Sequence, residues 1–295
     1  MKFATFTHAG RRAVGVVDPQ KGLVWPLDDV LGEPVADMLD LVRRYDEIEA
    51  RIRPNGHALA LADVVLDAPI PRPFRNILCV GKNYHEHAQE FAASGFDSSA
   101  TSKADAVPAA PIVFTKAPES VIGIDQPILH RAEVSDAVDY EAELGVIIGT
   151  GGRGIARKDA YAHVWGYTIV NDVTARDWQG RHKQWFLGKS FDTFCPMGPW
   201  IATADEVDPE NLSIKCWVND ELRQDANTRD LIFDIPTLIE TISAAVTLYP
   251  GDVIATGTPA GVGIGFTPPR YLAPGDRVRI EVEGIGTLVN PVAAG

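Results

Sequence analysis

Short apolar runs with the character of β-strands dominate this chain. Near the N-terminus they are "KFATFTH" and "RAVGVVD", and from residue 76 onward they are "NILCVG", "PIVFTK", "YEAELGVIIG", "HVWGYTIVND", "SIKCWVNDELRQ", "DVIATG" and "RVRIEVEGIGTLVN". Their β-branched and aromatic residues, with turn residues between the runs, favour strands. Apolar residues recur at helical spacing in "PVADMLDLVRRYDEIEARI", "NYHEHAQEFAA" and "IPTLIETISAAV". The pattern therefore predicts a mostly β protein with some α-helix.

A proline-rich connector divides this pattern into two parts. Two strand-like runs and a helical stretch precede it, and "LDAPIPRPFRN" then places Pro69, Pro71 and Pro73 within five positions. Prolines at this spacing favour an extended chain and a domain boundary. The sequence therefore predicts a small N-terminal α+β domain over residues 1–68 and a larger, β-rich domain over residues 69–295.

Composition excludes several classes of partner. The chain has 295 residues, 45% of them hydrophobic, and a formal net charge of -13. Nucleic acids and anionic membranes both attract basic faces, so this charge argues against either partner. No run approaches 18 apolar residues, and the N-terminus lacks the long apolar segment of a signal peptide. Cys79, Cys195 and Cys216 are too few and scattered for a disulfide framework, so we expect core cysteines and a cytoplasmic protein.

Two glutamates stand at the start of a strongly apolar strand. In "DYEAELGVIIG", Glu141 and Glu143 are two positions apart, so they point to the same face. Exposure at a solvated strand end is the simple interpretation. However, "LGVIIG" is apolar on both faces, as in a strand buried on both sides, and burying two unpaired carboxylates side by side is costly. A hard divalent cation with oxygen ligands, such as Mg²⁺, resolves this conflict.

A third carboxylate ends another apolar strand. In "WGYTIVNDVTARDWQ" the apolar run ends at Asp172, which could lie beside the glutamates if the two strands are neighbours. Asp177 is the competitor, but it lies beyond the strand, where we expect a solvated helix start. Asp139 shares the glutamate face by period, and we interpret it as a solvated residue at the start of the strand. The predicted metal ligands are therefore Glu141, Glu143 and Asp172.

A histidine and a glutamate at helical spacing are candidates for acid–base chemistry. In "GKNYHEHAQEF", His87 and Glu90 are i and i+3 neighbours on the predicted helix, so the carboxylate can orient the imidazole. A surface pair is the alternative, and His85 lacks a carboxylate at the matching position.

Two glycine motifs are incomplete. "GKS" ending at Ser190 lacks the first glycine of a phosphate-binding loop, and "GVGIG" lacks the third glycine of a dinucleotide site.

These pieces occur together in one order, and in that order the sequence resembles the fumarylacetoacetate hydrolase family. The matching segments run from about residue 76 to the C-terminus and are "CVGKNYHEHAQE", "PIVFTK", "DYEAELGVIIG", "GYTIVNDVTARDWQ", "GKSFDTFCPMGPW" and "GDVIATGTPAGVG". The resemblance implies a catalytic domain of mixed β-sheets, packed as a β-sandwich or β-roll. It also implies bound Mg²⁺ or Mn²⁺ and a homodimer, and the N-terminal unit resembles the small domain of longer bacterial members.

The resemblance also implies roles for single residues. Carried over by position, the three carboxylates match the metal ligands, and His87 and Glu90 match a pair that activates water. Lys189 matches a lysine that faces the negative charge developing on the substrate. The original members carry an additional aspartate ligand without a convincing equivalent here. The chain therefore looks closer to bacterial acylpyruvate hydrolases, oxaloacetate decarboxylases and homoprotocatechuate-pathway isomerases.

Further matched positions lie on the substrate side. Arg176 and Gln179 match residues near the substrate, and Thr258 matches one that holds a substrate carboxylate or oxo group. Residues 85–107 correspond to a mobile lid that orders when substrate binds. Part of this segment, "GFDSSATSKADAVPAAP", is small, polar and interrupted by proline, which also favours mobility.

The lead hypothesis is a divalent-metal-dependent hydrolase or lyase that cleaves a C–C bond in a small 2-oxo or 2,4-dioxo acid. It would hydrolyse an acylpyruvate or decarboxylate oxaloacetate through a metal-stabilised enolate. The alternative is an isomerase or tautomerase that moves a proton along a 2-hydroxydienoate, such as a 2-hydroxyhepta-2,4-diene-1,7-dioate isomerase. A non-enzymatic metabolite-binding protein would be favoured by missing ligands, but all matched positions are present. The expected partner is thus a small anionic 2-oxo acid.

Overall fold

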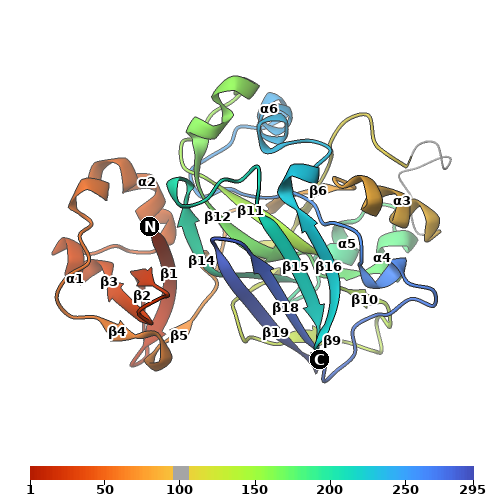
Figure 1. Cartoon of the computed structure of the whole chain (residues 1–295), viewed down its shortest axis with the longest axis horizontal. Helices are drawn as coiled ribbons and strands as arrows, with labels where there is room; N and C mark the ends of the chain where they lie inside the picture. Colours follow the sequence, from red (N-terminus) through yellow and green to blue (C-terminus); the bar gives the residue numbers. More distant parts are fainter. Residues whose placement is uncertain (96–105) are drawn as a thin grey trace.

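Two β-sheets packed against each other form the centre of the protein (Figure 1). The computed structural model describes residues 1–95 and 106–295. Within this part of the chain, a 12-stranded sheet has the order β4-β3-β2-β1-β14-β12-β11-β17-β6-β7, with β5 on β1 and β8 on β14. A five-stranded sheet has the order β16-β15-β18-β19-β9, and β10 pairs with β13. The prediction of a mostly β protein with some α-helix is confirmed.

The strands are short, as their turn-bounded runs predict. The large sheet contains β1 (Lys2–His8), β2 (Arg11–Asp18), β3 (Leu23–Pro26), β4 (Leu59–Ala60), β5 (Val65–Leu66), β6 (Ile77–Gly81), β7 (Ile112–Lys116), β8 (Val121–Ile122), β11 (Ala142–Ile148), β12 (Val164–Asn171), β14 (Cys195–Thr203) and β17 (Val253–Ala255). The remaining strands are β9 (Ile128–His130), β10 (Val138–Asp139), β13 (Thr174–Ala175), β15 (Ser213–Val218), β16 (Glu221–Asn227), β18 (Arg277–Val282) and β19 (Gly286–Ala294).

Helices lie around the sheets. The α-helices are α1 (Leu27–Leu31), α2 (Met38–Ile48), α3 (His85–Ala93), α4 (Arg176–Arg181), α5 (Phe186–Lys189) and α6 (Ile235–Ala245). The short 3₁₀ helices are η1 (Glu49–Arg51), η2 (Leu61–Asp63), η4 (Pro118–Ser120), η5 (Arg157–His163), η6 (Ala204–Glu206), η7 (Thr228–Asp230) and η8 (Gly263–Gly265). The three predicted helices correspond to α2, α3 and α6. The Asp37 side chain accepts a hydrogen bond from the Asp40 N–H at the start of α2, and Asp234 caps α6 in the same way.

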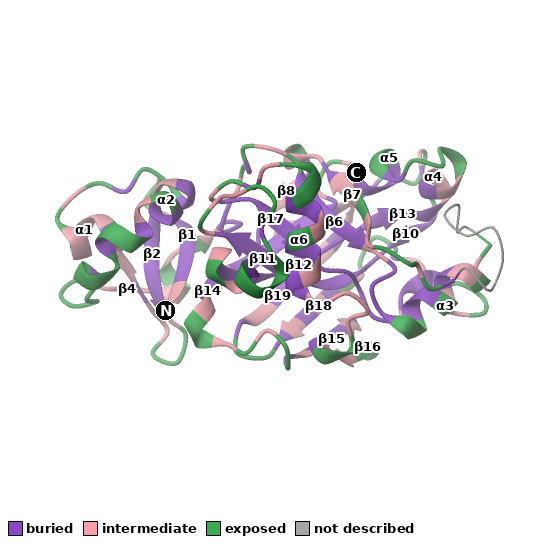
Figure 2. Cartoon of the chain, turned by 90° about the horizontal axis from the view of Figure 1, so that it is seen from above, coloured by how far each residue is buried: buried purple, intermediate pink, exposed green. Residues whose placement is uncertain are grey.

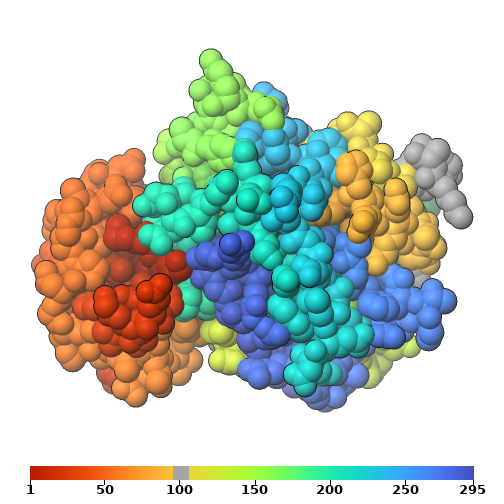
Figure 3. Space-filling model, viewed as in Figure 1, coloured from red at the N-terminus to blue at the C-terminus, as the bar shows by residue number. Residues whose placement is uncertain are grey.

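The N-terminal residues form a lobe at one end of the molecule (Figures 1 and 3). Its strands continue the large sheet through β1, where Lys2 lies opposite Ala202 and Phe3 opposite Ile201 of β14. Helix α2 packs Leu41 and other apolar residues into a core that also contains Ile201. The lobe and the rest of the chain therefore share both a sheet and a hydrophobic core, and a domain boundary at residue 68 stays a prediction.

The central strands β11 and β12 are buried on both faces (Figure 2). Leu144 and Tyr167 face the core that contains the five-stranded sheet, whereas Ile147 and Val170 face the core that includes the N-terminal lobe. This accounts for the apolar runs on both faces that the sequence shows. A charged side chain on the same face as Ile147 or Val170 is therefore shielded from water, which is costly unless the charge is paired.

Two of the runs predicted as strands are hairpins. "SIKCWVNDELRQ" folds as β15 and β16 around a turn in which Asn219 has φ of 56°, and "RVRIEVEGIGTLVN" folds as β18 and β19. The left-handed backbone needed in such turns is tolerated best by glycine and asparagine. Asn219 and Gly284 have positive φ in the two turns, so turn residues that could have divided each run were present in the sequence.

Other expectations concern the chain as a whole. All three cysteines are buried and free, as core residues should be. Across residues 1–95 and 106–295, no helix is long and apolar enough to cross a membrane. Within the predicted lid of residues 85–107, α3 is well defined, whereas residues 96–105 lie outside the described residues.

Candidate metal and catalytic site

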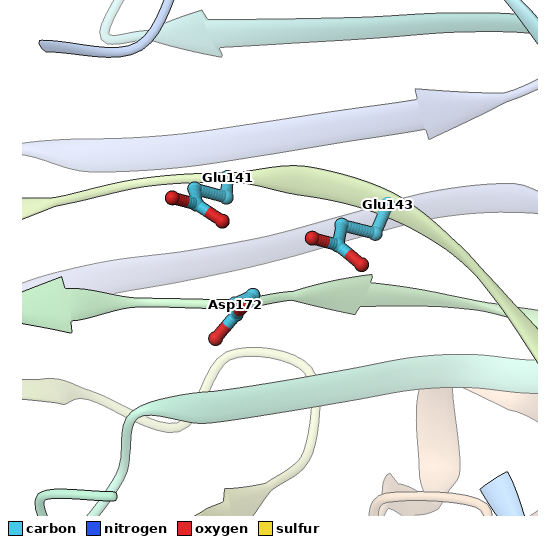
Figure 4. Close-up of side chains that lie close together, drawn as sticks. All are labelled: Glu141, Glu143 and Asp172. Atoms are coloured by element: carbon cyan, nitrogen blue, oxygen red, sulfur yellow. The ribbon is translucent and has the colours of Figure 1, made fainter. Parts of the chain in front are cut away.

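Strand register brings the three predicted metal ligands together. Strands β11 and β12 are antiparallel, with Ala142 opposite Asn171. Glu141 and Asp172, one step further out, are joined by a 2.9 Å hydrogen bond from the Asp172 N–H to the Glu141 carbonyl. Glu143 lies two positions from Glu141 and therefore on the same face. Figure 4 shows both glutamates pointing from one strand towards Asp172 on its neighbour. The three side chains are buried, and each offers a carboxylate oxygen within 4.8 Å of those of the others.

Glu141 is held by two cations. Its Oε2 accepts a 2.9 Å bond from Lys189 Nζ, and its Oε1 lies 2.7 Å from an Arg176 guanidinium nitrogen. Burial would raise the pKa of Glu141, but the charges of Lys189 and Arg176 outweigh it and lower this pKa to about 2. Glu141 is therefore an ionised carboxylate at neutral pH.

Glu143 is in a contrasting environment. Among the described residues its hydrogen-bond partner is the Gly257 N–H, 2.8 Å from Oε2. Burial, followed by the charges of Asp172 and Glu141, raises the pKa of Glu143 well above its ordinary value. Such a carboxyl group requires either a proton or an added cation at neutral pH.

Asp172 lies between two buried lysines. Lys189 Nζ donates to Asp172 Oδ2 at 2.7 Å, and Lys116 Nζ donates to Asp172 Oδ1 at 2.6 Å and to the Val173 carbonyl at 3.0 Å. Burial lowers the pKa of Lys189, but Asp172 and Glu141 outweigh it, so the net shift is upward and the ammonium stays charged. Sequence reasoning missed Lys116. The available signal was a charge at the end of the apolar run "PIVFTK", the same signal that identified Asp172.

The interpretation of Asp139 as a solvated residue is wrong. Asp139 is fully buried and accepts bonds from the Gly263 N–H at 2.6 Å, the Ile264 N–H at 3.0 Å and Arg176 Nε at 2.8 Å. The chain that covers Asp139 is more than 120 residues away in the sequence, so local pattern could not show its burial. Asp177 lies in the first turn of α4, as expected, and accepts a bond from Ser135 Oγ.

The His87–Glu90 pair forms on helix α3. His87 Nδ1 lies 3.1 Å from Glu90 Oε2, and the His87 side chain is buried. His85, the alternative histidine, is exposed at the start of the same helix. His87 therefore faces inward with its carboxylate partner, which contradicts a surface pair.

One small cavity is lined by most of the predicted residues. His87, Glu141, Arg176, Gln179, Lys189 and Thr258 line it together with Phe91, Phe114 and Trp185. The cavity has a volume of about 10 Å³, which is room for a single water at most. A substrate therefore gains access only if part of this wall moves.

The polar groups of the cavity wall are placed by their own contacts. Arg176 donates to Gln179 Oε1 at 3.2 Å, and Gln224 Nε2 donates to Thr258 Oγ1 at 2.8 Å. Within the described part of the chain, the buried Nη2 of Arg176 has no hydrogen-bond partner. A buried guanidinium with a free donor is an anchor for an anion, in particular a carboxylate.

The residues fit a divalent cation. Carboxylate oxygens are the ligands that Mg²⁺ and Mn²⁺ prefer, and the three candidates are buried and adjacent. Buried cationic side chains already pair with two of the three: Glu141 contacts Lys189 and Arg176, and Asp172 contacts Lys116 and Lys189. In the described part of the chain, by contrast, no cationic side chain forms an ion pair with Glu143, whose hydrogen-bond donor is the Gly257 N–H. That these residues bind a metal stays a prediction.

Comparison with known proteins adds an independent line of evidence. The family described as "Fumarylacetoacetate (FAA) hydrolase C-terminal" matches residues 76–293. The chain is 44% identical to oxaloacetate tautomerase YisK of Bacillus subtilis (strain 168), over 99% of this chain and 100% of that protein. It is similar to the solved fumarylacetoacetate hydrolase of Exiguobacterium antarcticum, with a TM-score of 0.85, 41% identity and full coverage of both chains. It is also similar to maleylpyruvate hydrolase of Sphingobium sp. SYK-6, solved with manganese(II) and pyruvate, with a TM-score of 0.81, 36% identity and full coverage of both chains.

Proposed function

Because this chain belongs to the fumarylacetoacetate hydrolase family, we propose that it is a divalent-metal-dependent enzyme that acts on oxaloacetate through its enol form. One observation carries the proposal. Glu141 of the buried carboxylate cluster, with its partners Lys189 and Arg176, lines one small cavity together with His87, whose imidazole contacts Glu90. A relative that matches end to end is named an oxaloacetate tautomerase, which supports this substrate.

Substrate binding relies on local positive charge in an acidic protein. The free Nη2 of Arg176 is a donor for one substrate carboxylate. The Thr258 hydroxyl and the Gln179 amide line the same cavity and offer further hydrogen bonds. Lys189 adds a buried ammonium, so an anion is attracted to this cavity although the chain as a whole carries -13.

Proton transfer is assigned to the His87–Glu90 pair. Glu90 beside Nδ1 favours the tautomer in which Nδ1 carries the proton, which leaves Nε2 to accept a proton from a substrate carbon or from water. Lys189 stabilises the negative charge that then develops on the 2-oxo oxygen. A divalent cation held by Glu141, Glu143 and Asp172 would supply Lewis-acid stabilisation of the same charge.

Keto–enol tautomerisation is the reaction that we place first. His87 moves one proton from C3 of oxaloacetate to the 2-oxo oxygen, so the enol forms with no net change in protons and no carbon–carbon bond breaks. This step, unlike hydrolysis of an acylpyruvate, needs no attacking water.

Carbon–carbon cleavage, which the sequence placed first, is the second candidate. The similar maleylpyruvate hydrolase was solved with manganese(II) and pyruvate, which supports the release of pyruvate. In an acylpyruvate, water activated by His87 would attack the distal carbonyl. In oxaloacetate, CO₂ would leave without an attacking water. Both routes leave the enolate that Lys189 stabilises.

Product analysis separates these candidates. Protein treated with EDTA and then supplied with Mg²⁺ or Mn²⁺ is mixed with enol-oxaloacetate, acetylpyruvate, fumarylpyruvate or a 2-hydroxydienoate. Enol absorbance, pyruvate and CO₂ are followed. We expect rapid, metal-dependent loss of the oxaloacetate enol without stoichiometric pyruvate. Pyruvate from the acylpyruvates would establish cleavage instead, and an equal rate in EDTA would contradict the metal dependence.

Two further properties are proposed on the family resemblance. We propose a homodimer, which light scattering on the purified protein tests directly. We also propose that α3, the described part of the predicted lid, moves away to admit substrate. The cavity volume requires such a movement of some wall, and α3 carries two of the lining residues, His87 and Phe91.

A further inference from the structure

The geometry points to Gly265 as a positioning residue for the His87–Glu90 pair. We infer that residue 265 must be glycine so that Glu90 can lie over the turn of η8 and reach His87. The structural part of this inference depends on contacts alone, and its kinetic part rests on the proposed function.

Both oxygens of Glu90 are engaged, on opposite sides. Oε2 lies 3.1 Å from His87 Nδ1, and Oε1 accepts a 3.1 Å bond from the Gly261 N–H. The Glu90 carboxylate thus lies between helix α3 and the loop that leads into η8, with one oxygen bound to each. Its side chain is 16% exposed, so one route outward to solvent is open.

Gly265 provides the space for this arrangement. A Cβ built on Gly265 would lie 1.8 Å from Glu90 Oε1 and 2.1 Å from Glu90 Cδ. Non-bonded atoms do not approach each other this closely. The backbone of Gly265 is not among the positive-φ positions, so alanine suits its conformation. Glycine is required here for room beside Glu90, and not for backbone freedom.

The loop itself is held rigidly from the other side. Asp139 accepts hydrogen bonds from Gly263 and Ile264 of η8, and the same carboxylate binds Arg176. A clash at residue 265 is therefore relieved more easily by rotation of the Glu90 side chain than by movement of the loop. Substitution of Gly265 should remove Glu90 from His87 while Arg176 and the three candidate metal ligands stay in place.

A double-mutant cycle tests this inference. The wild-type protein, Gly265→Ala, Glu90→Ala and the double variant are compared by thermal unfolding and by kinetics on oxaloacetate. We expect Gly265→Ala to lower Tm by roughly 2–4 °C through the lost contacts of a charged group. In the Glu90→Ala background the same change should raise Tm by roughly 1 °C, because alanine restricts the unfolded chain and the three atoms nearest its methyl group, all of the Glu90 side chain, are gone.

The substitutions should also change the kinetics on oxaloacetate. Gly265→Ala should lower kcat by about 10²-fold, as expected when an acid–base group loses its support, and should change KM little. In the Glu90→Ala background it should lower kcat no further. Glu86→Ala, an exposed glutamate on the same helix, is the matched control and should behave as wild type.

The same Tm change in both backgrounds would overturn the inference, because Gly265 would then serve some need other than Glu90. An equal fall in kcat in both backgrounds would do so as well. If the wild-type protein turns over none of the 2-oxo acids, the proposed function fails, but the Tm cycle still decides whether Gly265 positions Glu90.

Discussion

Replacing Glu143 by glutamine should separate metal binding from folding. In the absence of a cation, burial and neighbouring carboxylates favour the neutral form of Glu143. Glu143→Gln supplies a permanently neutral group of the same shape, and its amide oxygen can accept from the Gly257 N–H as Oε2 does now. The fold of the metal-free protein therefore loses nothing, whereas a metal site would lose one of its three carboxylates.

The contrasting substitution is Glu141→Gln. Glu141 accepts from Lys189 at one oxygen and from Arg176 at the other, so an amide NH₂ must face one of these donors in either orientation. Breaking a buried ion pair costs about 3–5 kcal/mol, or roughly 6–10 °C in Tm for a chain of this size. We expect that loss for Glu141→Gln in EDTA, and no comparable loss for Glu143→Gln.

Thermal unfolding with and without Mn²⁺ measures both effects. At a Mn²⁺ concentration 100 times Kd, binding should stabilise the wild-type protein by about 2.7 kcal/mol, or about 5 °C. Glu143→Gln should abolish most of this gain, while the surface control Glu86→Gln keeps it. In EDTA, raising the pH through the elevated pKa of Glu143 should destabilise the wild-type protein more than Glu143→Gln, because ionisation is disfavoured in the fold.

Two outcomes would contradict the assignment of Glu143 as a metal ligand held weakly by the metal-free fold. If Mn²⁺ raised the Tm of Glu143→Gln as much as that of the wild-type protein, the metal would bind elsewhere. A large loss of Tm in metal-free Glu143→Gln would show that the carboxylate is bound more strongly in the fold than its single contact indicates.

Three further substitutions test other parts of the site. Glu90→Gln should lower kcat on oxaloacetate by about 10²-fold or more, while the Mn²⁺-dependent gain in Tm stays as in the wild-type protein. Loss of that gain would show that Glu90 also supports metal binding and does not act through His87 alone. Arg176→Lys should raise KM at least as much as it lowers kcat, because a lysine cannot replace the fork of donors that a guanidinium offers a carboxylate. This is measured by steady-state kinetics, and an unchanged KM would exclude Arg176 as the substrate anchor. Lys116→Met should lower Tm in EDTA by roughly 6–10 °C, since it breaks a buried pair with Asp172, and calorimetry showing no change would mean that Lys189 alone suffices for Asp172.

Much of the fold could be predicted from local pattern. Helices α2, α3 and α6 and most strands coincide with runs whose periodicity and turn residues are visible in the sequence. The hairpins at Asn219 and between β18 and β19 were read as single strands, although Asn219 and Gly284 offered turn signals. A single asparagine or glycine is also compatible with a continuous strand, so only the pairing shows that the chain reverses there.

The site residues likewise fall into two groups, those that local pattern predicted and those that it did not. Local repeats were enough to predict that Glu141 and Glu143 share a face, that Asp172 ends a buried strand, and that His87 and Glu90 are neighbours on a helix. Asp139 and Lys116 were not identified as site residues. Asp139 is buried by η8, and Lys116 reaches Asp172 across the sheet.

Which charges meet depends on long-range packing. The register of β11 on β12 aligns Glu141 with Asp172, and the approach of η8 to α3 leaves room for Glu90 only beside a glycine. These contacts join residues that are far apart in the chain, and strand pairing can slip by one residue without changing the hydrophobic pattern of either strand on its own. The sequence therefore determined the chemistry that each strand and helix carries, whereas packing determined the partners, because burial makes an unpaired charge costly only once the fold has closed around it.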